Sequence, residues 1–283
     1  MIPGEITKGG KVILAAAGPG DPELITVKAV RYLQQADVVL TDRLVSNDIL
    51  KQYVNPHARV IYVGKQCRRG NSTPQQTINQ LMIDYASEGK LVVRLKGGDV
   101  SVFSNILDEL QVLVQHHIAY EIIPGVTAAL GAAAYAGIPL TARGHSTAVR
   151  LLTYYKSDVV PDQYWQEIAG TNDTLVFYMS AETVEGIVSK LIRYGVGRDK
   201  HIAVIEQATT PLQQVHTANI YDYLQQFRDM SFISPSLVII GKVVALHEQF
   251  AWFANAPERA QYFKSIASLQ NNTHNQQAHV SRA

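Results

Sequence analysis

Cysteine is nearly absent from this sequence, which has Cys67 alone among 283 residues. A single thiol excludes an intrachain disulfide, and no histidine within a few residues could join it as a metal ligand. Net charge is also small, since 25 basic and 24 acidic side chains leave +1, and no global field directs the chain to nucleic acid or an anionic surface. No apolar run reaches the roughly 20 residues of a membrane span, and residues 1–9 lack a signal or transit pattern. We therefore expect a cytoplasmic protein without metal, nucleic-acid or membrane partners.

Apolar residues make up 47% of the chain and charged residues 17%, a balance typical of a globular protein with an ample core. Strand-length apolar runs alternate with helical patterns, which predicts an α/β fold of two domains with mostly parallel or mixed sheets. A helix with its apolar residues on one face is predicted after Pro74, and another from Val184 to Ile192. The predicted strands are 12–17, 38–40, 59–63, 91–95, 120–123, 174–179, 202–206 and 237–240.

Gly137, Pro139 and Gly144 interrupt the regular patterns of the chain, and we place the domain boundary near residues 141–146. The predicted domains are 1–143 and 144–254, followed by an extension over 255–283. From about residue 269 the extension is polar and nearly free of apolar residues, which predicts disorder. His274 and His279 in this tail are only weak evidence for a metal.

The first predicted strand ends in the turn Gly18-Pro19-Gly20-Asp21-Pro22. Glycines allow a ligand to approach the backbone at the carboxyl end of a strand, where open α/β sheets bind small molecules. The turn lacks the third glycine of the dinucleotide fingerprint, and Asp21 would repel a pyrophosphate, which disfavours a nicotinamide dehydrogenase. Asp21 is predicted to cap the next helix, with Pro22 at its first position and Val27, Val30 and Leu33 on one face. Alternatively, the glycines serve only the turn.

Two further segments carry candidate binding residues. Gly97-Gly98-Asp99 directly follows the strand at 91–95, and Asp99 can accept hydrogen bonds from a ligand or simply cap a tight turn. Between Asp48 and Asp84 there are five basic residues and no acidic one. Arginine forms forked contacts with carboxylates, so a pair such as Arg68-Arg69 suits a ligand that carries carboxylates, although a solvated basic loop is the alternative.

These motifs resemble those of the tetrapyrrole methylases and, within that family, the uroporphyrinogen-III C-methyltransferases. The resemblance implies two α/β domains with the active site in the cleft between them, a tetrapyrrole substrate and a homodimer. It runs in order through roughly residues 10–250 and is carried by residues 16–26 (AAGPGDPELIT), 41–46 (TDRLVS), 64–65, 95–99, 124–128, 135–141, 177–179 and 208–211.

The resemblance also implies roles for individual residues. S-adenosylmethionine brings an activated methyl group, so such an enzyme mainly aligns donor and acceptor and manages one proton. Asp42 would be the proton acceptor and Lys65 the proton donor, while a carboxylate can also stabilise the cationic intermediate. Which of the two does the chemistry stays open, as does the alternative that Asp42 is a turn cap paired with Arg43. The implied S-adenosylmethionine site comprises Pro19, Gly97, Gly98, Asp99, Val102, Thr127, Ala128, Met179 and Ala208, and the implied substrate contacts are Arg43, Arg68 and Arg69.

Several positions depart from the family pattern. Thr41 replaces a tyrosine, Val100 a proline and Ala16 a glycine, and residues 153–155 (TYY) replace TGH. Residues 103–109 (FSNILDE) replace a glycine-rich FGRGGEE loop, which predicts a helix start capped by Ser104 or Asn105. The implied reaction is methylation of uroporphyrinogen III at C2 and C7 to precorrin-2, in sirohaem- or cobalamin-type biosynthesis. Two alternatives stay open: a sister methylase acting on a later precorrin or another acceptor, and a weakened protein that binds S-adenosylmethionine or tetrapyrrole.

Overall fold

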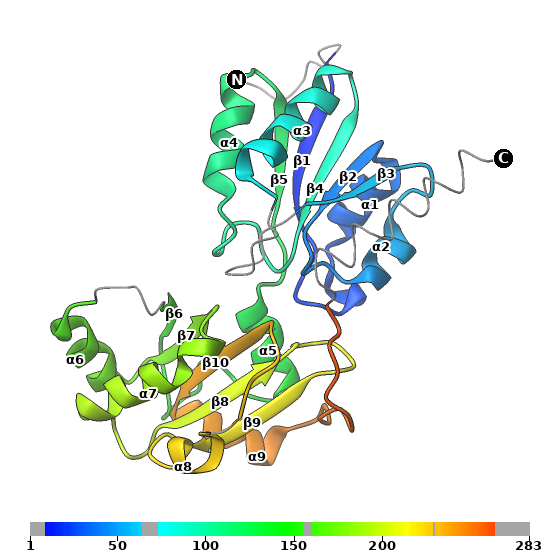
Figure 1. Ribbon diagram of the computed structural model, residues 1–283. Helices are drawn as coiled ribbons and strands as arrows, with labels where there is room; N and C mark the ends of the chain where they lie inside the picture. Colours follow the sequence, from blue (N-terminus) through cyan, green and yellow to red (C-terminus); the bar gives the residue numbers. More distant parts are fainter. Residues whose placement is uncertain (1–8, 64–72, 155–159, 229, 264–283) are drawn as a thin grey trace. The chain divides into compact units, whose positions relative to one another are not determined.

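A computed structural model of the chain describes residues 9–63, 73–154, 160–228 and 230–263 (Figure 1). The described chain forms two compact units, one reaching to Thr127 and including Phe263, the other running from Ala128 to Tyr262. Each unit contains one five-stranded sheet covered by helices. The predicted α/β fold with two sheets is therefore confirmed.

All five strands of the first sheet are parallel, in the order β3-β2-β4-β1-β5. Both faces of this sheet are covered by helices, so its inner strands β1, β2 and β4 are buried and largely apolar, whereas the edge strands β3 and β5 are partly exposed. All five were found from the sequence. Their bounds are β1 (Lys11–Ala16), β2 (Val38–Thr41), β3 (Arg59–Tyr62), β4 (Leu91–Lys96) and β5 (Ala119–Ile123).

The helices of the first unit divide between the two faces of the sheet. Helices α1 (Val27–Gln35) and α2 (Asn47–Tyr53) cover one face, and α3 (Gln75–Ser87) and α4 (Ile106–Gln115) cover the other (Figure 1). Ile78, Met82 and Ala86 are buried on α3, as the sequence predicts. Each face of the sheet therefore has its own apolar core.

The start of α1 differs from the prediction. Asp21 caps a short 3-10 turn, η1 (Pro22–Leu24), by accepting a hydrogen bond from Glu23 N at 2.8 Å. The α-helix begins only at Val27, where Thr26 Oγ1 accepts from Ala29 N at 3.3 Å. The predicted face was wrong at Val27, which is 69% exposed, because Ala29 and Leu33 are the buried residues.

The second sheet is mixed, with the order β6-β7-β10-β8-β9 and only β6 and β7 parallel. Strands β6 and β9 escaped prediction because they lie at the edges of the sheet, where half-exposed and polar residues interrupt the apolar pattern. The bounds are β6 (Val149–Thr153), β7 (Thr174–Tyr178), β8 (His201–Glu206), β9 (Gln214–Asn219) and β10 (Ser236–Gly241).

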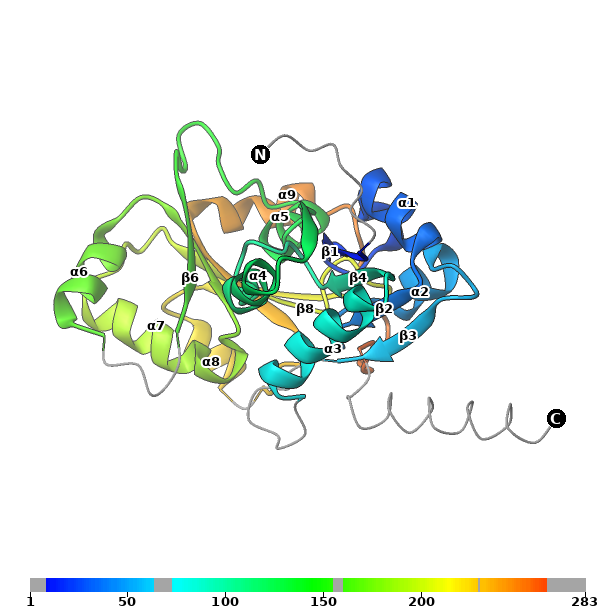
Figure 2. The ribbon, with the colours of Figure 1, turned by 90° about the horizontal axis from the view of Figure 1, so that it is seen from above.

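Helices also cover both faces of the second sheet (Figure 2). On one face, α6 (Asp162–Gly170), α7 (Val184–Arg193) and α8 (Tyr223–Phe227) pack on the sheet. On the other lie α5 (Ala128–Tyr135), the 3-10 segment η3 (Lys242–Leu246) and α9 (His247–Phe250). The sequence predicted α7 but not α6, α8 or α9.

Helix α5 belongs to the second unit, so the two compact units divide earlier than the predicted domain boundary at 143/144. Ala129 N donates to Tyr178 Oη at 3.0 Å, and Trp252 Nε1 donates to Ala134 O at 2.8 Å. The glycines and proline that suggested the boundary mark a loop inside this unit. Residues 255–262 of the predicted extension also lie in the second unit, while 264–283, including the predicted disordered tail, fall outside the described residues.

Glu121, which lies on β5, contacts three polar side chains of the first unit. Its carboxylate pairs with Lys11 Nζ at 2.8 Å and with Lys28, and accepts from Tyr32 Oη at 2.6 Å. Hydrogen bonds from Lys11, Lys28 and Tyr32 lower the pKa of Glu121 from its ordinary 4.5 to about 2. The folded state therefore gains stability from this carboxylate above pH 4.5 and loses it as pH falls towards 2.

Replacing this carboxylate should change acid stability in a defined window. We expect Glu121→Gln to lower the free energy of unfolding at pH 7 by about 1 kcal/mol, a modest amount because the pairs are partly exposed. The difference between the two proteins should shrink as pH falls from 4.5 towards 2, as measured by urea unfolding at several pH values. A difference that stays constant over that range would contradict the role of Glu121.

Candidate functional site

The carboxyl ends of the parallel strands lie together at one edge of the first sheet. After β1 the chain continues to α1 on one face, and after the neighbouring β4 it continues to α4 on the other (Figure 1). Two adjacent strands that diverge in this way form the switch point at which open α/β sheets bind ligands. The predicted site residues that follow these strands are Pro19 after β1, Asp42 and Arg43 after β2, Gly97, Gly98, Asp99 and Val102 after β4, and Thr127 after β5.

The turns after β1 and β4 are bonded to each other at this switch point. Gly18 and Gly98 exchange two backbone hydrogen bonds, of 3.1 Å from Gly18 N and 2.7 Å from Gly98 N. Both glycines have positive φ angles, +79° and +71°, in a region that side-chain-bearing residues rarely adopt. These turns are therefore fixed by their glycines.

Asp99 links the same turn to the loop after β5. Its Oδ1 accepts from Ser101 N at 2.7 Å, and its Oδ2 accepts from Gly125 N at 2.9 Å. The alternative that Asp99 caps a tight turn is thus realised. Each carboxylate oxygen has a second lone pair, so a ligand contact remains compatible with these two bonds.

Two further glycines let the loops at this edge pack closely. A Cβ on Gly97 would lie 3.0 Å from Leu44 Cβ and 3.0 Å from Leu44 O, in the loop after β2. A Cβ on Gly125 would lie 2.5 Å from Ala16 Cβ at the end of β1. The loops after β1, β2, β4 and β5 therefore form one closely packed cradle of backbone, which suits a small ligand bound through main-chain groups.

Asp42 is a more exposed carboxylate at the same edge of the sheet than Asp99. Its Oδ1 accepts a charge-assisted hydrogen bond from Arg94 Nη2 at 2.7 Å, and 24% of its side chain is exposed. The nearby Arg43 is half-buried. Asp42 therefore combines a fixed carboxylate with access to solvent, as a residue that handles protons requires.

Behind Asp42 lies a buried ionic cluster that the sequence prediction missed. Arg94 Nε donates to Glu109 Oε1 at 3.0 Å, and Lys96 Nζ donates to Glu109 Oε2 at 2.9 Å. The side chains of Arg94, Glu109 and Lys96 are only 3%, 1% and 4% exposed. The sequence did carry one signal for it: Arg94 and Lys96 stand two positions apart in an otherwise apolar strand, and side chains at that spacing lie on the same face.

Burial and neighbouring charges act differently on the two cations of this cluster. Burial lowers the pKa of Lys96 and the charge of Arg94 lowers it further, against the attraction of Glu109 and Asp42. Burial also acts to lower the pKa of Arg94, but the carboxylates of Asp42 and Glu109 outweigh it and raise that pKa. Arg94 therefore stays charged beside Asp42.

In the second unit, Met179 follows β7 and Ala208 follows β8. The carboxyl ends of these two strands lie at the same edge of the sheet, since both strands are antiparallel to β10. Met179 has a φ of 53°, and the neighbours of Ala208, Gln207 and Thr209, have φ angles of 47° and 63°. Non-glycine residues in this strained region are concentrated at functional sites. The second unit thus offers two strained turns at one sheet edge, at the positions predicted to bind the donor.

The loop at 103–109 begins a helix as predicted, because α4 starts at Ile106. Asn105 occupies the N-cap position, as one of the two predicted caps, but it has a φ of 55° and its side chain makes no capping hydrogen bond. Ser104 Oγ donates instead to Val100 O. Lys65, Arg68 and Arg69, like Cys67 and Tyr155, lie outside the described residues, so their predicted roles stay predictions.

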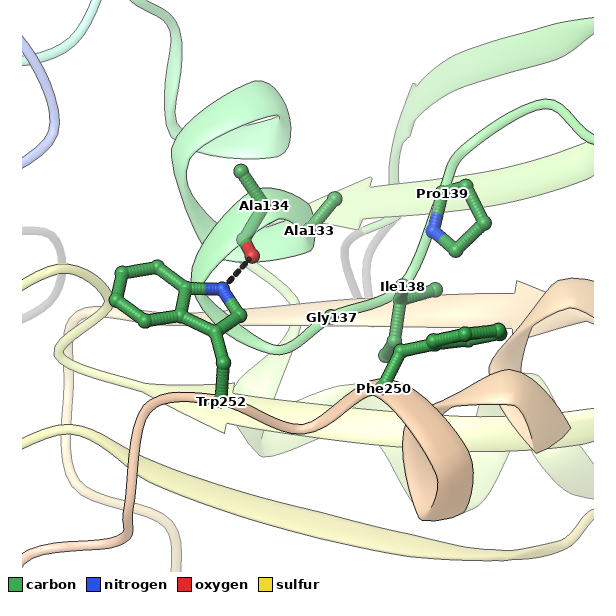
Figure 3. Close-up of a pocket in the computed structure, with 7 residues that line it drawn as sticks. All are labelled: Ala133, Ala134, Gly137, Ile138, Pro139, Phe250 and Trp252. Atoms are coloured by element: carbon green, nitrogen blue, oxygen red, sulfur yellow. Dashed lines mark hydrogen bonds between the residues drawn. The ribbon is translucent and has the colours of Figure 1, made fainter.

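A different surface feature is a shallow apolar hollow in the second unit (Figure 3). It has no titratable lining residue, so it offers no acid or base for chemistry. Its lining residues are Ala133, Ala134, Gly137, Ile138, Pro139, Phe250 and Trp252.

Within the described ranges, no three or more His, Cys, Asp or Glu side chains are grouped to hold a metal ion. No helix in that part of the chain has the length and apolarity needed to cross a membrane.

Comparison with known proteins links this geometry to one family. A sequence model of the family described as tetrapyrrole (corrin/porphyrin) methylases matches residues 11–223. A siroheme synthase from Saccharophagus degradans is 44% identical over 248 residues, which cover 88% of this chain and 54% of that protein. The chain thus spans about half the length of the curated relatives that it matches.

Solved structures are similar over most of the chain. A cobalt precorrin-4 methyltransferase matches with a TM-score of 0.74 and 28% identity, covering 83% of this chain and 95% of that one. A uroporphyrin-III C-methyltransferase from Thermus thermophilus, complexed with S-adenosyl homocysteine, matches with a TM-score of 0.70 and 34% identity. That match covers 84% of this chain and 100% of the solved one.

Proposed function

This chain belongs to the tetrapyrrole (corrin/porphyrin) methylase family and is an S-adenosylmethionine-dependent methyltransferase, and we propose that it methylates uroporphyrinogen III at C2 and C7 to give precorrin-2. The observation that carries the choice of acceptor is the similarity to a uroporphyrin-III C-methyltransferase over the whole length of that protein. Two molecules of S-adenosylmethionine are consumed, one for each new carbon–carbon bond.

The donor is held, in this proposal, mainly by backbone. Gly97, Gly98 and Asp99 form the cradle after β4, with Val102 further along the same loop and Pro19 and Thr127 on the loops after β1 and β5. Close packing at Gly97 and the paired turns of Gly18 and Gly98 fit a ligand that needs near approach to the main chain. Ala128, Met179 and Ala208 of the second unit are assigned to the same donor as part of this proposal.

The donor supplies a methyl group on a positively charged sulfur, so the protein has only to align the reacting carbon and manage charge. When the pyrrole carbon takes the methyl group, the carbon–sulfur bond breaks and the positive charge passes to the macrocycle. Asp42 stabilises that charge and accepts the proton that the macrocycle then releases. We assign Lys65 to proton donation, and Arg43, Arg68 and Arg69 to the carboxylates of the acceptor.

The biological setting is also a proposal. We propose that the reaction belongs to sirohaem- or cobalamin-type tetrapyrrole biosynthesis, which the similarity to siroheme synthases and to a cobalt precorrin-4 methyltransferase supports. We propose a homodimer that works in the cytoplasm, and sedimentation of the purified chain tests the dimer. A monomer at micromolar concentration with full activity would contradict it.

Anaerobic incubation with uroporphyrinogen III and methyl-labelled S-adenosylmethionine tests the proposed reaction. We expect the product mass to rise by two methyl groups per macrocycle, with label in both. Donor binding without any transfer to this acceptor would contradict the proposal and favour a protein that only binds S-adenosylmethionine or tetrapyrrole.

A later precorrin is the second candidate acceptor. The replaced loop at 103–109 and the TM-score of 0.74 to a cobalt precorrin-4 methyltransferase favour it. Competition between uroporphyrinogen III and a precorrin in one incubation separates the two candidates. Preferential labelling of the precorrin would favour this second candidate.

A further inference from the structure

We propose that Arg94 is a positioning residue that holds the Asp42 carboxylate in the orientation needed for methyl transfer, and that Glu109 and Lys96 hold Arg94 in turn. This inference rests on the proposed function of Asp42. Arg94 lies on β4, and Asp42 lies directly after the neighbouring β2. Contact between them at 2.7 Å therefore joins two strands at the ligand-binding edge.

Arg94 is fixed from several directions at once. Its Nε donates to Glu109 Oε1 at 3.0 Å, and its Nη1 donates to the carbonyl oxygens of Leu40 at 3.3 Å and Leu95 at 3.2 Å. A guanidinium is planar, with its N–H groups in fixed directions. Hydrogen bonds to these three acceptors fix the plane and orientation of the guanidinium. They therefore fix the position of Nη2, which donates to Asp42 Oδ1.

Three buried side chains of the cluster lie behind one partly exposed carboxylate, that of Asp42. The cluster contains two cations and two carboxylates, and only the Asp42 side chain, at 24%, is appreciably exposed. Buried ion pairs often stabilise a fold no better than apolar residues of the same volume would. A buried cluster that ends in one accessible carboxylate at a switch point is therefore better explained by the site than by stability.

The same cluster connects Asp42 to the donor cradle. Lys96, which binds Glu109 Oε2 at 2.9 Å, directly precedes Gly97. Arg94 binds Oδ1 of Asp42, and in this proposal Oδ2 takes the proton released by the methylated macrocycle. A displacement of about 1 Å in such a reacting group can cost about 100-fold in rate.

Arg94→Lys, made both in the natural chain and in an Asp42→Asn background, tests this role. Lysine keeps the charge but cannot bind Glu109, two carbonyls and Asp42 together. In the natural background we expect kcat for label transfer to fall about 100-fold, with KM for S-adenosylmethionine changed less than about 3-fold. In the Asp42→Asn background the same substitution should change kcat less than about 2-fold, because Arg94 acts through Asp42.

Glu109→Gln provides a milder variant in case Arg94→Lys fails to fold. It loosens the far end of the cluster, and we expect a loss of about 10-fold that again disappears beside Asp42→Asn. Glu121→Gln, which breaks ion pairs on β5 of the same sheet, is the control and should keep kcat.

Two results would contradict the role of Arg94 and leave the proposed function intact. The first is an unchanged kcat in Arg94→Lys. The second is an equal loss of kcat in the natural and Asp42→Asn backgrounds, which would indicate a purely structural role. If the natural chain transfers no methyl group to uroporphyrinogen III, the proposed function fails, and the role of Arg94 fails with it.

Discussion

Asp42→Asn should lower kcat for methyl transfer by about 10³-fold while the protein still binds S-adenosylmethionine. Asparagine has the size of aspartate but neither its negative charge nor its capacity to accept a proton at neutral pH. The charge that develops on the macrocycle then loses the Asp42 carboxylate as counter-ion, and Arg94 loses one of its two ionic partners, the one at 2.7 Å. Label transfer measured anaerobically gives kcat, and titration calorimetry gives the dissociation constant of the donor.

Asp48→Asn is the matched control for this prediction. Asp48 lies six positions further along the chain, in the first turn of α2, and its side chain is 56% exposed. We expect kcat in this variant to stay within about 2-fold of the natural value, as for most surface substitutions. An Asp42→Asn protein with near-natural kcat would show that Asp42 only orients the loop, and Lys65 would become the residue to test for proton transfer.

Gly98→Ala should weaken binding of S-adenosylmethionine by about 10- to 100-fold, or about 1.4 to 2.8 kcal/mol. The φ of +71° at Gly98 is unfavourable for alanine, so the turn should rotate and lose its paired hydrogen bonds with Gly18. Because the proposed donor cradle is built on those bonds, the change should reach the ligand. Titration of the purified variant with S-adenosylmethionine measures the effect.

Gly89→Ala separates backbone strain from ligand binding. Gly89 has a φ of +80°, and a Cβ there would meet nothing within 4 Å. Both alanine variants should lose about 1–2 kcal/mol of unfolding free energy from the left-handed conformation. Only Gly98→Ala should weaken donor binding, and equal affinity in the two variants would contradict the assignment of the cradle.

The sequence predicted those helices and strands whose apolar pattern is complete within the element itself. The buried strands of the first sheet were found because both of their faces are covered, and α3 was found because Ile78, Met82 and Ala86 repeat at helical spacing. The edge strands β6 (VRLLT) and β9 (QVHTAN) were missed because polar residues interrupt their apolar pattern. The spacing of Val27, Val30 and Leu33 was misleading, because at 3.6 residues per turn Val27 lies about 120° around the helix from Leu33. Ala29 and Leu33, four positions apart, share the buried face instead.

The candidate site was predictable only where residues close in sequence act together. Gly97, Gly98 and Asp99 form one turn, and the structure brings them to the switch point beside Asp42. The contact between Asp42 and Arg94 joins residues 52 positions apart, and that distance closes only when β2 and β4 pair. No periodicity in the sequence carries such information.

Product analysis tests the central claim most directly. We would incubate the chain anaerobically with uroporphyrinogen III and S-adenosylmethionine carrying ¹³C in its methyl group, and locate the labelled carbons by NMR. Two labelled methyl groups, one on C2 and one on C7, are the predicted result. Label on any other carbon, or an unlabelled macrocycle beside bound donor, would contradict the assignment of uroporphyrinogen III as the acceptor.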